Sequence, residues 1–168
     1  MFVEAVFASV VEGGIKDADH DFLGNVKTLV TVMGVKVKDK KLHLTTPFII
    51  FAYIFRICYF GLIILLGFQP EINIWNSGNI ILLVIVFILL ILVALLFYKF
   101  LSLNHKTHDR SIIKKMYAGI NVVNIGLIFV MLYPMFGTII VLSLLMLPLT
   151  WYIVLNTILY GKALQPWS

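Results

Sequence analysis

Arg56 is the residue whose type and position are best suited to chemistry, because it is a charge in the middle of a long apolar run. The run reads PFIIFAYIFRICYFGLIILLGF and extends from about residue 47 to residue 68. An arginine at the centre of a membrane helix costs about 2.5–3.5 kcal/mol on insertion scales, so something should compensate its charge. Three arrangements could do so. The flexible stem could carry the guanidinium to headgroup phosphates, amide oxygens on neighbouring helices could accept from it, or another molecule could supply an acid or anion.

Three asparagines could join Arg56 in a polar layer inside the membrane. Asn121 and Asn124 are three positions apart, so they share a face of a helix. Asn156 lies near the end of the following apolar stretch. Counted along the expected helices, all four residues fall in the cytoplasmic half of the membrane, with Arg56 at a depth of about 14 Å. Such a layer could fix the register of the helices through hydrogen bonds, or it could contact a substrate or ion.

Two further polar segments are candidates for metal-binding sites, one for zinc or iron and one for calcium. His105, His108 and Asp109 have a spacing that could hold zinc or iron, but no cysteine lies nearby, and a solvated basic loop is the favoured interpretation. The segment Asp17–Asp21 resembles the start of a calcium loop. It has Phe22 where that motif needs glycine and Thr28 where it needs glutamate, so the match fails.

Enzyme and nucleic-acid functions find little support in the sequence. There is no Gly-x-Ser-x-Gly motif, no phosphate-binding loop, no pair of catalytic carboxylates and no cofactor motif, and Cys58 is the single cysteine. The net charge is +5, but the basic residues flank apolar segments, which is typical of membrane topology and not of nucleic-acid binding. A membrane enzyme that acts on lipids through His105 and His108 remains as a minor hypothesis.

The elements that must position these residues are membrane helices. Of the 168 residues, 61% are hydrophobic and 12% are charged, and the apolar residues form long runs. The charge-free stretch Ile80–Tyr98 would be about 28 Å long as a helix, enough to cross the hydrocarbon core. We therefore expect an all-α membrane protein with four transmembrane helices, at about residues 47–68, 80–101, 116–133 and 138–160.

The last two spans are predicted from one apolar tract, about twice the length of a single span. Tyr133-Pro134-Met135-Phe136-Gly137 is the break near its centre, and we expect two helices to fold back there. One long helix that leaves the membrane, or a re-entrant pair, are the alternatives.

The lysines predict the orientation of the spans. Basic residues precede the first span, follow the second and follow the fourth, whereas the connections at Gln69–Asn79 and at Pro134 contain none. By the positive-inside rule, residues 1–45, the loop after the second span and the tail at 163–168 should all be cytoplasmic. Both termini are then in the cytosol.

The N-terminal 45 residues carry two short amphipathic patterns, one at Phe2–Val11 before Gly13-Gly14 and one at Phe22–Met33. Both are too short to span a bilayer, so we expect them on the inner membrane surface or under the bundle. The alternating stretch Val35–Leu44 could form a hairpin with Asp39-Lys40 at its turn, although an extended basic linker is favoured.

These observations predict a small integral membrane subunit or adaptor that binds membrane lipids and other membrane proteins or itself, and no nucleic acid. Arg56 contributes to this hypothesis, because the predicted spans contain no acid that could pair with it. An oligomeric transporter or channel component for an anion or a lipid is the alternative function.

Overall fold

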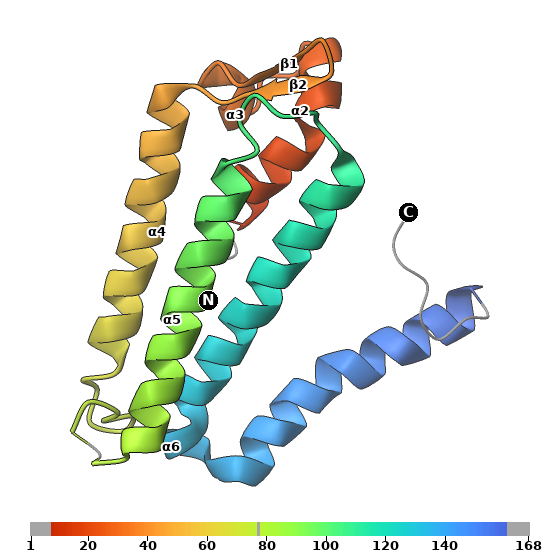
Figure 1. Ribbon diagram of the computed structural model, residues 1–168. Helices are drawn as coiled ribbons and strands as arrows, with labels where there is room; N and C mark the ends of the chain where they lie inside the picture. The colour runs from red at the N-terminus through yellow and green to blue at the C-terminus, as the bar shows by residue number, and fades with distance from the viewer. Residues whose placement is uncertain (1–7, 77, 161–168) are drawn as a thin grey trace.

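Three long helices form most of the molecule in the computed structural model, which describes residues 8–76 and 78–160 (Figure 1). They are α4 (Thr46–Leu66), α5 (Ile80–Leu101) and α6 (Arg110–Tyr160). Each begins where a polar side chain accepts from backbone N–H groups of its first turn. Thr45 caps α4, Asn79 caps α5, and Asp109 accepts from the N–H groups of Ser111 and Ile112 at the start of α6.

Among the described residues, three segments are long and apolar enough to cross a membrane: Thr46–Leu66, Ile80–Leu101 and Arg110–Leu144. The helices α4 and α5 agree with the first two predicted spans to within two residues at each end. The third predicted span begins earlier than expected, at Arg110.

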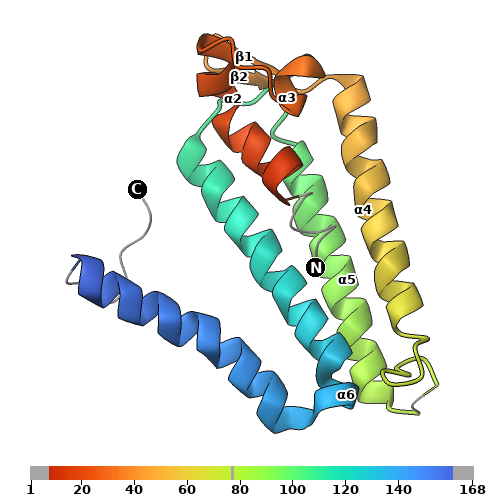
Figure 2. The same ribbon diagram turned by 180° about the vertical axis from the view of Figure 1, so that it is seen from behind.

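The predicted turn between the third and fourth spans is a break at a single residue, Gly137, inside α6. Its φ of 70° and ψ of 174° are not helical, and they belong to a region that is accessible essentially to glycine alone. The part of α6 before Gly137 packs beside α5, whereas the part after it turns away from the other helices (Figures 1 and 2). The structure therefore has a sharp bend where we expected a fold back onto the bundle.

The N-terminal segment packs within the bundle, whereas we expected it on the inner membrane surface or under the bundle. A π-helical turn, η1 (Ala8–Gly13), runs directly into α2 (Gly14–Leu23), so Gly13-Gly14 does not end this helix. The segment lies next to the first part of α6 in both views (Figures 1 and 2). Val11, Ile15 and Ala18 are fully buried, and burial of this apolar face accounts for the insertion.

A small cap covers the end of the bundle at which α4 begins. It contains α3 (Leu29–Val32) and the antiparallel strands β1 (Lys36–Lys38) and β2 (Lys41–His43). Asp39 and Lys40 both have positive φ at the two-residue turn, so the hairpin forms and the favoured linker interpretation was wrong. The loop between α5 and α6 joins the cap through backbone hydrogen bonds between Leu42 and residues 105 and 106.

The described part of the interior has two apolar clusters. One lies at the cap end and includes Ile15, Phe48 and Phe100, and the other lies toward the 67–79 connection and includes Ile63, Ile74 and Leu127. The buried face of α4 runs through both clusters, with residues at a helical spacing of three or four: Phe48, Ala52, Arg56, Tyr59 and Ile63.

Candidate functional site

Glu12 and Arg56 form an ion pair inside the bundle. The Nη2 atom of Arg56 donates to Oε1 of Glu12 at 3.0 Å, and the two side chains are 3% and 0% exposed. Arg56 is at the middle of α4 and at the middle of its buried face, so its side chain points into the bundle. The acid comes from the π-helical turn η1, which the first part of α6 helps to hold in place.

Two aromatic rings lie close to the guanidinium. Its Cζ atom lies 4.7 Å from the ring centroid of Phe97 on α5 and 5.6 Å from that of Tyr59, one turn further along α4. A cation over an aromatic face gains about 2 kcal/mol or more when it is desolvated. Arg56 therefore meets one charge and two rings, drawn from η1, α4 and α5.

The ion pair corrects the expectation that this chain supplies no acid to Arg56. Glu12 supplies a counterion to the guanidinium from within this chain. Sequence reasoning missed Glu12 because acids were sought only within the predicted spans. One signal was present: Glu12 directly follows the apolar pair Val10-Val11, and an acid that is buried with such residues needs a partner.

The asparagines do not share one environment. Asn124 is buried in the bundle and Asn121, one turn earlier on α6, is half-buried. The side chain of Asn156 lies outside the described part of the structure, although its backbone belongs to α6. A polar layer that joins Asn121, Asn124 and Asn156 to Arg56 stays a prediction.

The histidines of the loop between α5 and α6 have structural contacts. His108 Nε2 lies 3.1 Å from the backbone oxygen of Ile15, and its Nδ1 lies 3.9 Å from Asp19. The ring of His105 instead packs edge-on against that of His43. Asp109 caps α6, and among residues 8–76 and 78–160 no three His, Cys, Asp or Glu side chains gather as a metal site would require.

A second charged group attaches α2 to the start of α6. Arg110 binds Asp19 through Nε at 3.1 Å and through Nη2 at 3.0 Å, and its Nη2 also lies 3.3 Å from Asp17. All three side chains are partly exposed, so water screens these contacts far more than the Glu12–Arg56 pair. The N-terminal helix is thus held by one buried and one exposed ionic contact.

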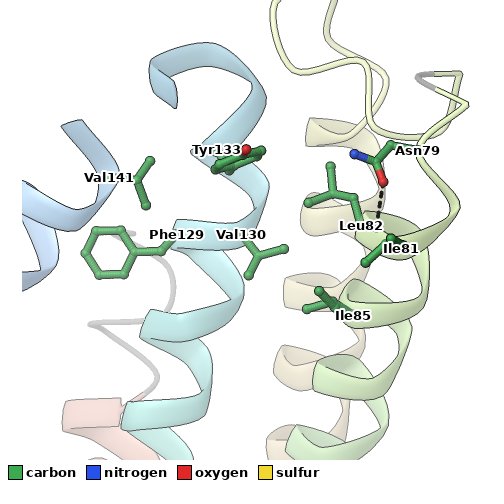
Figure 3. A pocket seen from close by; sticks show the side chains of 8 residues that line it. All are labelled: Asn79, Ile81, Leu82, Ile85, Phe129, Val130, Tyr133 and Val141. Atoms are coloured by element: carbon green, nitrogen blue, oxygen red, sulfur yellow. Dashed lines mark hydrogen bonds between the residues drawn. The ribbon is translucent and has the colours of Figure 1, made fainter. Parts of the chain in front are cut away.

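An apolar pocket of about 360 Å³ lies between α5 and α6 at the end opposite the cap (Figure 3). Asn79 and Tyr133 supply its two polar side chains, at the end next to the connecting loops (Figure 3). The rest of the lining is hydrophobic and comes from Ile81, Leu82, Ile85, Phe129, Val130 and Val141. None of the described residues that line the pocket is charged, so it is suited to an apolar ligand.

Comparison with known proteins gives no match. No protein-family model, curated protein or solved structure matches this chain. The function must therefore be argued from the ion pair, the bent helix α6 and the pocket.

Proposed function

We propose that this chain is a small integral membrane subunit or adaptor that binds other membrane proteins through the second part of α6. In this proposal residues 138–160 form a fourth span, and both termini are cytoplasmic. The distribution of lysines supports the orientation, because the 67–79 connection contains none and the loop between α5 and α6 contains several basic residues.

One observation carries the proposal. Within the described side chains from Thr138 to Val154, none is buried and Val141 alone is half-buried. Large apolar residues on several sides of this segment are exposed, among them Ile139 and Leu147. A span whose described side chains find no cover among the described residues is available to pack against another membrane protein.

Two small polar residues indicate how a partner helix could approach. Ser143 and Thr150 are seven positions apart and therefore share a face of α6. Both are exposed, and their hydroxyls donate to backbone oxygens of the same helix, Ile139 for Ser143 and Met146 and Leu147 for Thr150. Small residues on one face of a helix allow two membrane helices to approach closely.

Arg56 no longer supports the adaptor hypothesis, because its charge is paired with Glu12 of the same chain. The test must therefore address α6. Chemical cross-linking in native membranes, followed by purification of the tagged chain, should recover a partner. Ser143→Leu with Thr150→Leu should reduce this recovery strongly, because bulky side chains keep the partner helix at a distance.

Ser143→Ala with Thr150→Ala is the matched control. It keeps both side chains small and should preserve the recovery of the partner. Equal recovery from the leucine and alanine variants would contradict assembly through this face.

A transporter or channel component is the second candidate, and the buried ion pair favours it. Ionisable side chains inside a membrane often mark ion or proton pathways. The reconstituted chain should then show anion or lipid flux that is lost when Glu12→Leu and Arg56→Met are combined. Flux that persists in this double variant would remove the ion pair from any pathway.

A further inference from the structure

The pocket between α5 and α6 opens near the ends of two apolar helix segments, the start of α5 and the break in α6 at Gly137. Asn79 is the N-cap of α5, and Tyr133 is one turn before the break at Gly137, so both polar residues mark the ends of apolar helices. Ile85 follows Asn79 on α5 and Phe129 precedes Tyr133 on α6, so both lie farther from the connecting loops than the two polar residues (Figure 3). The pocket is therefore polar at its interfacial end and apolar inside.

Hydrogen bonds at the interfacial end are arranged to leave a donor for a ligand. The Tyr133 hydroxyl accepts from Oγ1 of Thr138 at 3.4 Å, so its own hydrogen can be donated elsewhere. The Asn79 carbonyl oxygen accepts from the N–H of Leu82 at 3.1 Å, which fixes the direction of this amide. An acceptor such as an ester carbonyl would suit this end.

We propose that the pocket binds one acyl chain of a bilayer glycerolipid, with the ester carbonyl of that chain at Tyr133. The described lining residues are all neutral, so the charged headgroup stays outside in the interfacial layer. The volume of about 360 Å³ lies at the small end of the range for ligand pockets, which suits one chain and not a whole lipid. This site does not depend on the assembly role of the second part of α6.

Photolabelling of the purified full chain in mild detergent tests the proposal. The probe is a phosphatidylcholine with a diazirine in one acyl chain, and mass spectrometry of the peptides locates the adducts. We expect adducts concentrated on residues 79–85 and 129–141, and we expect excess unlabelled phosphatidylcholine to suppress them. Adducts that are spread over all lipid-facing surfaces, or that the competitor leaves unchanged, would overturn the proposal.

Val130→Trp and Tyr133→Phe test the apolar and the polar part of the pocket separately, and Ile125→Trp is the control for the first. Val130→Trp fills the pocket and should abolish the saturable adducts, whereas Ile125→Trp places the same bulk on an exposed position of α6 outside the pocket and should leave them unchanged. Tyr133→Phe removes one hydrogen bond, and the affinity for the lipid should fall about fivefold. Labelling that responds equally to both tryptophan variants would contradict a site in this pocket.

A sterol with the same diazirine group distinguishes the ligand class. Weak labelling that unlabelled phosphatidylcholine removes would support an acyl-chain site. Saturable labelling by the sterol that phosphatidylcholine does not suppress would overturn the assignment to a glycerolipid. Competition on the unsubstituted chain decides the question even where a variant fails to fold.

Discussion

Glu12 and Arg56 are 44 positions apart in the sequence and 3.0 Å apart in the bundle. The N-terminal helix carries the acid from the cap end into the interior, where it meets the arginine of α4. The buried arginine on α4 needs an acid beside it, and the N-terminal helix supplies this acid by inserting next to α4. This relationship explains why the N-terminal helix enters the bundle although its length cannot span a membrane.

The ion pair should show strong coupling between its partners. Glu12→Leu or Arg56→Met alone leaves a buried charge without its counterion and should lower the free energy of unfolding by about 3–5 kcal/mol. The double variant removes both charges and should lose far less. Unfolding of the purified chain by SDS in mixed micelles measures the cycle. Single effects that simply add in the double variant would contradict a direct interaction.

The exposed contact at Arg110 should contribute little and should depend on salt. Arg110→Ala should lower the free energy of unfolding by about 0.2–1 kcal/mol, because the side chain and both carboxylates are partly exposed. At low salt, amide hydrogen exchange of α2 should be slightly faster in this variant than in the unsubstituted chain. This difference should shrink at about 1 M salt. A large, salt-independent effect would mean that Arg110 has a further role.

Two glycines should be intolerant of even one methyl group. A Cβ atom at Gly14 would overlap the side chain of Val30, and one at Gly67 would overlap the indole of Trp75. That indole donates to the backbone oxygen of Ile64 at 2.7 Å and closes the connection between α4 and α5. Gly14→Ala and Gly67→Ala should each lower the free energy of unfolding by about 1–3 kcal/mol.

Gly61 and Gly119 are the matched controls for these substitutions. A Cβ atom at either position meets no heavy atom within 4 Å, and both glycines are helical. Their replacement by alanine should be neutral or should stabilise by up to about 1 kcal/mol. A loss of stability at Gly119 equal to that at Gly14 would argue against the packing of α2 on α3.

Gly137 should control the direction of the second part of α6. An alanine there would hold a strained backbone at a cost of about 1–3 kcal/mol, so the helix should change its bend instead. The distance between spin labels on Leu92 of α5 and Leu147 of α6, in a Cys58→Ser background, measures this change. An unchanged distance distribution in Gly137→Ala would show that neighbouring residues set the bend.

Labelling of single cysteines should report the sidedness of the connections. In a Cys58→Ser background, the cysteine of Asn76→Cys should react with an impermeant reagent added to sealed native vesicles whose non-cytoplasmic face is outward, because its connection lacks Lys and Arg. The cysteine of Lys106→Cys should react only after permeabilisation. The same response at both sites would contradict the proposed topology.

The sequence by itself determined the helices α4 and α5 and the break near Gly137. Apolar runs of about 20 residues are set by the thickness of hydrocarbon, and glycine alone readily adopts the backbone angles of the bend. These are local properties of the chain. They predicted where α4 and α5 begin and end, and they marked Arg56 as a charge that needs compensation.

The tertiary structure decided which face of each helix is inside and what Arg56 meets there. The helix α4 is apolar on every side, so its sequence could not show that Phe48, Arg56 and Ile63 form the buried face. The partner of Arg56 comes from a distant, short helix, and spacing along the chain carries no information on such a contact. Burial of Val11 and Ile15 together with neutralisation of a charge places Glu12 there, and both effects exist only once the helices have packed.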